Sequence, residues 1–174
     1  TLTESSLILS RFGLISKEYL HLGSYGPSKG QKVAFKHLKK FRLPMITTSS
    51  SKKVLIEGME DVKIIKANFN EYNILLKNAK ATICMSEFKE GWCRVLHEAA
   101  IHGTPIMGSG LGGMSELLNI GGFPASTADK LSNDFNLRVK DISLSKDKIN
   151  LYRAFTLKKF NETWRQCVLE ILDV

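Results

Sequence analysis

Two glutamates, Glu90 and Glu98, are the first candidates for chemistry because they bracket the expected start of a helix. That helix follows residues 81–85, an apolar run typical of a buried strand. A helix that begins at the carboxyl end of a parallel strand directs backbone N–H groups into the crevice where such sheets bind ligands. A carboxylate at that mouth can accept hydrogen bonds from sugar hydroxyls. We therefore expect Glu90 to lie at a ligand cleft.

The same glutamates also fit a purely structural role. Glu90, Arg94 and Glu98 are spaced four residues apart, so they would form a charge ladder on the solvent-facing side of a helix. Two glutamates taken alone favour that ladder. The surrounding residues 87–116, EFKEGWCRVLHEAAIHGTPIMGSGLGGMSE, change the balance because they combine several fixed spacings over about thirty positions.

This stretch resembles the signature segment of the family 4 glycosyltransferases, which runs Glu-Gly-Phe-Gly, apolar residues, Glu-Ala, Gly-Thr-Pro and a Gly-Gly-x-x-Glu turn. The matching positions are Glu90-Gly91-Trp92-Cys93, Val95-Leu96, Glu98-Ala99, Gly103-Thr104-Pro105 and Gly112-Gly113-Met114-Ser115-Glu116. The resemblance implies that Glu90 is the catalytic residue that contacts the donor sugar, and that Glu98 contacts the nucleotide ribose. The amides of Gly91, Trp92 and Cys93 would hold the sugar or diphosphate, with Cys93 standing where the family usually has glycine.

A second resemblance lies upstream, where residues 20–30, LHLGSYGPSKG, look like the family's first strand and its Gly-Arg…Lys-Gly turn. It implies that Gly23 lies at the donor and that Lys29 neutralises the donor diphosphate. Ser24 occupies the position of the family's arginine, so Arg94 or Lys32 would have to supply a second cation. For Lys29 alone, an exposed turn lysine is the structural alternative.

The loop 66–70 corresponds to the family's base-binding stretch, where mostly backbone groups read the base. The resemblance therefore places Asn68 at the donor. Asn68 or Asn70 is equally suited to cap the helix that follows, in an ordinary strand-to-helix loop.

Residues 108–113, GSGLGG, satisfy the Gly-x-Gly-x-x-Gly pattern and raise the alternative of a dinucleotide-binding fold. That fingerprint belongs in an opening βαβ unit, with an acidic residue about twenty positions on. Here it lies inside the chain, and the segment 121–124 that follows carries no acid. A glycine-rich turn that lets the donor approach the backbone fits better. The four histidines have no evident metal or triad partner and are expected to be ordinary side chains; they are His21, His37, His97 and His102.

Strand-like runs alternate with helical periodicities, which predicts an α/β fold with a Rossmann-like parallel sheet flanked by helices. Strands are expected at residues 18–22, 44–48, 62–65, 81–85 and 104–107. Helices are expected after the first strand, from Asn68 or Asn70 to about residue 77, over 92–100 with Trp92 on the apolar face, and beyond Gly113. A further strand and helix are expected within 122–138, and two helices broken near Phe160 from residue 148 to the end.

The domain organisation follows from length and resemblance. A chain of 174 residues has room for one substantial core. We predict that residues 1–17 are a lead-in or linker from an N-terminal domain, and that residues 18–174 form a nucleotide-sugar-binding domain. The resemblance covers roughly residues 19–174 and implies the C-terminal domain of the GT-B architecture. It also implies metal-independent, retaining transfer to an acceptor held by the N-terminal domain, so this chain alone is expected to be inactive.

The composition and charge of the chain indicate which kinds of binding partner to expect. Hydrophobic residues make up 43% and charged residues 24%, as in folded globular proteins. The net charge of +8 would attract polyanions or an anionic membrane, although a solvated lysine face is the simpler interpretation. The clustered lysines are Lys32, Lys36, Lys39, Lys40, Lys52 and Lys53. No aromatic residues interleave them as a base-stacking surface requires, so nucleic acid is not expected.

The expected location is the cytoplasm, with possible peripheral contact with a membrane. Three cysteines without metal-ligand spacing suggest neither a disulfide framework nor a zinc site, and no run is long enough to span a bilayer. Three function classes stay open at this point: half of a transferase, a free-standing nucleotide-sugar-binding module, and a dinucleotide-binding protein.

Overall fold

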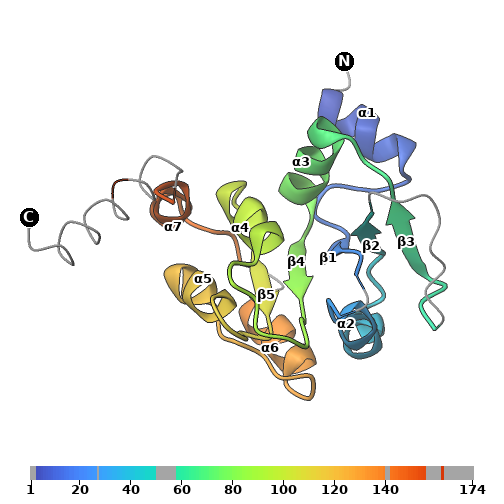
Figure 1. Ribbon diagram of the computed structural model, residues 1–174. Helices are drawn as coiled ribbons and strands as arrows, with labels where there is room; N and C mark the ends of the chain where they lie inside the picture. Colours follow the sequence, from blue (N-terminus) through green and yellow to red (C-terminus); the bar gives the residue numbers. More distant parts are fainter. Residues whose placement is uncertain (1–2, 27, 50–57, 140–141, 156–161, 163–174) are drawn as a thin grey trace, which may run out of the picture.

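The computed structural model describes residues 3–26, 28–49, 58–139, 142–155 and 162. These residues form a parallel five-stranded sheet in the order β3-β2-β1-β4-β5, with helices packed around it (Figure 1). The predicted Rossmann-like α/β fold is therefore confirmed. The strands are β1 (Leu20–Ser24), β2 (Met45–Thr48), β3 (Val62–Ile65), β4 (Ala81–Cys84) and β5 (Ile106–Gly108).

Three of the described helices begin at a residue whose side chain caps them, and these residues are Thr3, Asn68 and Ser145. Asn68 caps α3 (Phe69–Asn78) in a reciprocal capping box, in which its side chain accepts from the Glu71 N–H and the Glu71 carboxylate accepts from the Asn68 N–H, both at 2.9 Å. Within the described residues, no helix is both long and apolar enough to cross a membrane. The helices are α1 (Glu4–Arg11), α2 (Gln31–Leu38), the 3-10 helix η1 (Lys39–Phe41), α3 (Phe69–Asn78), α4 (Arg94–Ile101), α5 (Met114–Gly121), α6 (Leu131–Arg138) and α7 (Lys146–Arg153).

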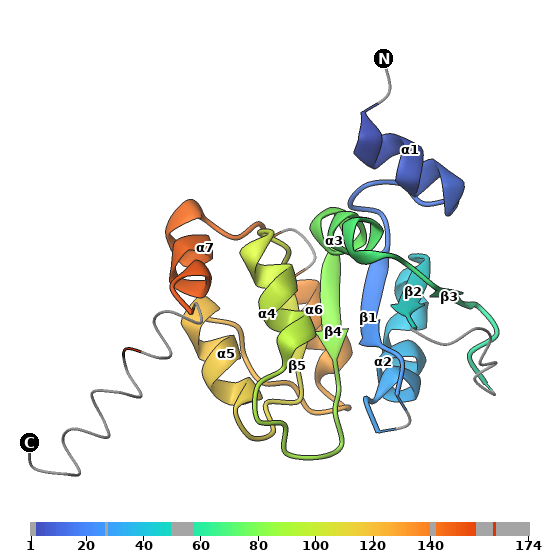
Figure 2. The same cartoon turned by 45° about the horizontal axis from the view of Figure 1, so that its top comes forward.

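Alternate residues of the central strands are buried on opposite faces of the sheet, as parallel strands covered on both sides require. Leu20 and Leu22 pack with α2 and α6, in a core cluster that includes Phe135. Ile46 packs on the other face with Leu75 of α3. Figure 2 shows α3 and α4 in front of the sheet and α6 behind it. The sheet is thus the middle layer of three.

The strand order creates a switch point between β1 and β4. From β1 the chain moves outward through β2 to β3, and then returns to place β4 on the opposite side of β1. At such a point the connections leave in opposite directions, which opens a crevice at the carboxyl ends of the two strands. Those ends are Ser24 and Cys84.

Some predicted boundaries are wrong. The first strand begins at Leu20, two residues later than expected, and runs to Ser24. The strand expected within residues 122–138 is reduced to an isolated bridge between Ala125 and Gly108. Pro124, the residue before Ala125, has no N–H to donate to a neighbouring strand, and this limits the pairing of the segment. Helix α6 is present as expected, whereas the helix predicted beyond Phe160 lies outside the described residues.

The segment predicted as a lead-in carries structure of its own. Residues 4–11 form α1, and Leu9 and Leu14 belong to the same core cluster as Leu75 of α3. Arg11 also forms an ion pair with Glu71 at the start of α3. The segment therefore packs against the sheet's helical layer, and its role as a linker to another domain stays a prediction.

Candidate functional site

A cavity of about 440 Å³ opens at the switch point between β1 and β4. Five of the residues that the sequence predicts at the donor line it: Lys29, Glu90, Trp92, Cys93 and Glu98. The cavity is also lined by Ser24, Phe69, Tyr72, Cys84, Arg94 and Val95. The site thus gathers the two predicted glutamates and the predicted lysine around one cleft.

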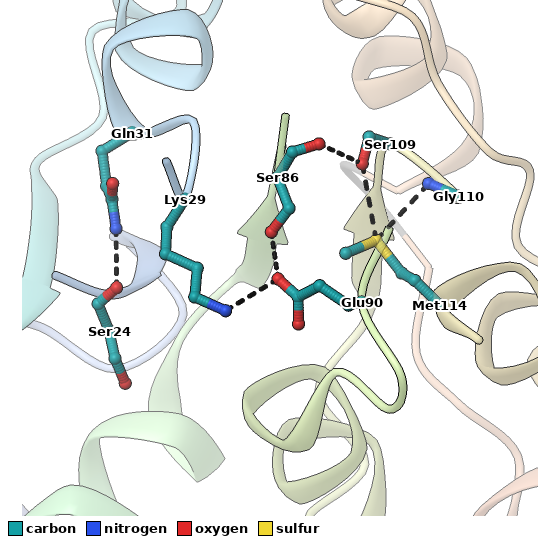
Figure 3. Close-up of polar contacts among 8 residues, drawn as sticks. All are labelled: Ser24, Lys29, Gln31, Ser86, Glu90, Ser109, Gly110 and Met114. Carbon is teal, nitrogen blue, oxygen red and sulfur yellow. Dashed lines mark hydrogen bonds and ion pairs between the residues drawn. The ribbon is translucent and has the colours of Figure 1, made fainter. Parts of the chain in front are cut away.

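At one end of the cleft, Lys29 and Ser86 both donate to the same oxygen of Glu90 (Figure 3). Lys29 Nζ lies 2.9 Å from Glu90 Oε1, and the Ser86 hydroxyl also donates to Oε1. The Glu90 side chain is only 7% exposed, compared with 35% for Lys29. Ser86 is held in turn, because the Ser109 hydroxyl donates to its carbonyl oxygen at 2.8 Å. We call Lys29, Ser86 and Glu90 the inner cluster.

The ionisation of Glu90 follows from these contacts. Burial would raise the pKa of Glu90, but hydrogen bonds from Ser86 and Lys29 outweigh it and hold the pKa below its usual range. Glu90 is therefore a carboxylate at neutral pH. An ionised carboxylate can only accept hydrogen bonds, so a ligand group that meets Glu90 directly must donate one.

The loop that carries Glu90 rests on the glycine-rich turn. The Gly113 N–H donates to the Glu90 carbonyl at 2.8 Å, and the Glu90 N–H donates to the Leu111 carbonyl at 3.2 Å. A Cβ on Gly113 would lie 1.6 Å from the Gly91 carbonyl oxygen, and one on Gly112 would lie 2.3 Å from that of Glu90. The backbone of residues 90 and 91 therefore requires glycine at these two positions, and the approach of a donor to this turn stays a prediction. These contacts explain why this turn contains Gly112 and Gly113, so the two glycines do not require a bound dinucleotide.

At the other end of the cleft, Glu98 of α4 accepts two hydrogen bonds. The Tyr72 hydroxyl donates to Glu98 Oε2 at 2.8 Å, and Arg94 Nη2 lies 3.4 Å from Oε1. Burial and the contact with Glu98 raise the pKa of Tyr72, which keeps its hydroxyl protonated as a donor. Phe69, 82% exposed, borders the same end. We call Phe69, Tyr72, Arg94 and Glu98 the outer cluster.

The charge ladder is confirmed for Arg94 and Glu98 but is wrong for Glu90 and Arg94. Helix α4 begins at Arg94, so Glu90 precedes it and faces Lys29 instead. Trp92 also precedes the helix, contrary to the predicted helical face. Its ring packs on His97 and Phe155, with centroid distances of 5.5 and 5.2 Å. Trp92 thus closes the cleft wall from a loop.

Three predicted donor residues do not line the cavity. Gly23 has a φ of 71°, and a Cβ there would lie 2.7 Å from Cys84 Sγ, so glycine is required by the backbone and by packing. Asn68 caps α3, which agrees with the structural alternative for this residue. Gly91 contacts the glycine-rich turn. Contacts of all three with a donor stay predictions.

Sequence reasoning missed Tyr72, and it included Phe69 only as part of the loop 66–70 that the resemblance assigns to the base. A usable signal was present, because both follow the Asn68 cap within the first turn of α3, and the helix begins at the same sheet edge as the cleft. Neither residue belongs to the motifs that pointed to Glu90 and Glu98.

The histidines and metal ligands can be judged only within the described residues. There, no group of three or more His, Cys, Asp or Glu side chains could hold a metal ion. His21 is fully buried and hydrogen-bonded to Thr48, and burial lowers its pKa to about 3, so it is neutral. His97 contacts the Tyr152 carbonyl and His102 contacts Asn73. The independence from metal stays a prediction.

Solved structures with the same fold include glycosyltransferases. No protein-family model and no curated protein sequence matches this chain. AviGT4, a glycosyltransferase involved in avilamycin A biosynthesis, is 19% identical with a TM-score of 0.63 over 87% of this chain and 51% of its own. Sucrose-phosphate synthase from Thermosynechococcus elongatus is 18% identical, with a TM-score of 0.71 over 95% of this chain and 48% of its own.

A third similar structure holds a nucleotide sugar. Anabaena Alr3699/HepE in complex with UDP-glucose is 20% identical, with a TM-score of 0.65 over 99% of this chain and 53% of its own. The present chain spans about half the length of each of these three proteins. At this level of identity, the likeness establishes the fold that they share.

Proposed function

We propose that this chain is the donor-binding domain of a family 4 glycosyltransferase that uses a nucleotide diphosphate sugar and transfers the sugar with retention. The observation that carries the proposal is the inner cluster. A lysine and a buried carboxylate meet at the switch point of a Rossmann-like sheet, where such folds bind phosphorylated ligands. The fold shared with glycosyltransferases supports it.

Each part of the cleft has chemistry that suits one part of such a donor. Lys29 attracts the diphosphate, and the Glu90 carboxylate accepts hydrogen bonds from the sugar hydroxyls. Glu98 accepts from the ribose hydroxyls, held in place by Tyr72. Phe69 offers an exposed ring for the base.

The missing family arginine is best replaced by Arg94. Ser24 lines the cleft but is neutral, whereas the Arg94 side chain lines it and is 84% exposed. Lys32, the other candidate, is not among the residues that line the cleft. Arg94 stands at the start of α4, so it can turn from Glu98 toward a bound diphosphate without unfolding the helix.

The acceptor would be held by a second domain. Transfer requires an acceptor in line with the anomeric carbon, and such positioning supplies a large part of the rate enhancement. Donor binding alone does not speed the chemistry. Because this chain spans about half of the proteins it resembles in fold, we propose that an N-terminal domain completes the active site. Comparable turnover by this chain and by a longer version of the protein would contradict this.

The lysine face is proposed to contact an anionic membrane from the cytoplasmic side. Lys32, Lys36, Lys39 and Lys40 are exposed on α2 and η1, and none forms an ion pair within the described part of the chain. Anionic lipid surfaces attract such segments. Binding to anionic vesicles that is lost on replacing these lysines with glutamine would support the contact.

The proposal is tested by calorimetry with UDP-, GDP- and ADP-linked sugars in the presence of a metal chelator. We expect one class to bind, since Lys29 and backbone N–H groups can carry the diphosphate charge. Glu98→Ala should weaken binding of the nucleotide, and Glu90→Ala should reduce the preference for the nucleotide sugar over the bare nucleotide. Each loss should be about 1.5–3 kcal/mol.

Glu87→Ala is the matched control. Glu87 lies three residues from Glu90 but is exposed and does not line the cleft. It should bind like the unaltered chain. A folded chain that binds none of these sugars would overturn the proposal, and binding without transfer in any longer version would favour a free-standing binding module.

A further inference from the structure

Three aromatic rings from three segments meet at one wall of the cleft. Trp92 lines the cleft from a loop, two residues after Glu90. Its ring packs on His97 of α4 at a centroid distance of 5.5 Å, and on Phe155, just beyond α7, at 5.2 Å. The rings of His97 and Phe155 also pack on each other, at 6.1 Å. Neither of these two residues lines the cleft, so both support Trp92 from outside it.

The two supporting rings are held by one carbonyl group. The Tyr152 carbonyl accepts from His97 Nε2 at 2.8 Å and from the Phe155 N–H at 3.3 Å. A carbonyl oxygen has two lone pairs and can only accept, so His97 carries a proton on Nε2. Tyr152 is itself fully buried, and its hydroxyl donates to the Leu117 carbonyl of α5 at 3.0 Å. The end of α7 therefore fixes both rings.

We propose that Phe155 and His97 are positioning residues, which hold the Trp92 ring as the apolar wall of the subsite for the donor's sugar. In this way α7 takes part in recognition of the donor from outside the cleft. The positioning of Trp92 depends only on the packing of the three rings. Its effect on the sugar rests on the proposed function of the cleft.

The loop that carries Trp92 and Glu90 offers the two kinds of surface that a sugar ring needs. A sugar carries hydroxyl groups around its edge and C–H groups on its faces. Glu90 accepts hydrogen bonds, whereas the indole of Trp92 has an apolar face with partial negative charge, which attracts C–H hydrogens. Ordering a free side chain on binding costs conformational entropy. The contact with Phe155 has already restricted the indole, so this cost is reduced.

A matched pair of side chains separates this role from general packing. Phe155 is 51% exposed, and Leu151 of α7 is 52% exposed one turn earlier. Truncation of either side chain removes a half-exposed apolar group from the same end of α7. Only Phe155 carries a ring that packs on Trp92. A difference between the two truncations therefore measures the ring contact.

The first measurement is the fluorescence of Trp92 in the full chain carrying Trp164→Phe, which leaves one tryptophan. In this background, Phe155→Ala should shift the emission to longer wavelength and increase quenching by acrylamide, because water reaches the indole. Phe155→Tyr keeps the ring and should restore the original spectrum. Leu151→Ala should leave the spectrum unchanged. An unchanged spectrum in Phe155→Ala, or an equal shift in Leu151→Ala, would overturn the positioning role.

The second measurement is calorimetry of the same variants with a nucleotide sugar and with its bare nucleotide. Phe155→Ala should lower affinity for the nucleotide sugar roughly two- to tenfold, the range that an aromatic pair contributes, and should change affinity for the bare nucleotide little. Phe155→Ala combined with Trp92→Ala should lose no more than Trp92→Ala alone, since Phe155 acts through that ring. If Phe155→Ala does not fold, Phe155→Leu replaces it and should change both measurements in the same direction.

The two measurements separate the possible failures. A shifted spectrum with unchanged affinity for the nucleotide sugar would overturn the effect on the donor, as would equal losses for the nucleotide sugar and the bare nucleotide. Additive losses in the double variant would show that Phe155 does not act through Trp92. If the folded chain binds no nucleotide sugar while the spectrum responds as expected, the proposed function fails and the positioning of Trp92 stands.

Discussion

The inner and outer clusters each contain a carboxylate and a cation, but they differ in burial and in how firmly their groups are held. Lys29 and Glu90 are 2.9 Å apart, with the glutamate side chain 7% exposed. Arg94 and Glu98 are 3.4 Å apart, and their side chains are 84% and 33% exposed. Glu90 is fixed by Ser86 as well, whereas Arg94 extends into solvent.

The difference indicates which end of the cleft is built before a ligand arrives. Removing one partner of a buried pair leaves a poorly solvated charge behind, which is costly. An exposed pair gains little, because water and salt compete with it. Under the proposed function, the inner cluster would be a rigid receptor for the diphosphate and sugar, and the outer cluster would adapt to the nucleoside.

The largest expected effect comes from the inner cation. Lys29→Met keeps the length of the side chain but removes its charge, so the diphosphate loses its charge-assisted contact. Donor affinity should fall by about 2–3 kcal/mol, or roughly 30- to 150-fold, in calorimetry. Lys32→Met, an exposed lysine outside the cleft, is the control and should change affinity little. Equal losses for both would mean that general charge, not the inner cluster, attracts the donor.

A smaller effect is expected at the positioning residue of the outer cluster. Tyr72→Phe removes the hydroxyl that orients Glu98 and leaves the ring in place. Nucleotide affinity should fall by about 1 kcal/mol, roughly fivefold, because Glu98 can regain a hydrogen bond from water. The double variant with Glu98→Ala should lose no more than Glu98→Ala alone. Additive losses would show that Tyr72 acts independently of Glu98.

The fold was predictable because its signals are local, and hydrophobic runs predicted the five strands to within two residues. Lys29 and Glu90 were assigned to one site by the resemblance, whereas nothing in the sequence pointed to Ser86. A full strand was predicted where the structure has only an isolated bridge at Ala125. The sequence of a short segment does not show how many residues of a neighbouring strand it will pair with.

The place of Tyr72 beside Glu98 and the role of the glycines depend on packing between segments that are distant in the sequence. Tyr72 reaches Glu98 because α3 lies beside α4. The sequence predicts that the glycine-rich turn lets a donor approach, and it gave no sign that Gly112 and Gly113 also make room for the backbone of residues 90 and 91. The atoms that pack against a glycine are set by the tertiary structure, and the spacing of motif residues does not predict them.

The smallest expected effect is on folding, from the exposed cation of the outer cluster. Arg94→Ala removes an i,i+4 pair from the first turn of α4, where the arginine is 84% exposed. The free energy of unfolding should change by less than about 0.5 kcal/mol, and the change should disappear in molar salt, because exposed pairs are screened. Urea denaturation at low and high salt measures both quantities. A loss well above 1 kcal/mol that persists in salt would mean that the outer cluster is as firmly built as the inner one, and the distinction between a rigid and an adaptable end of the cleft would be wrong.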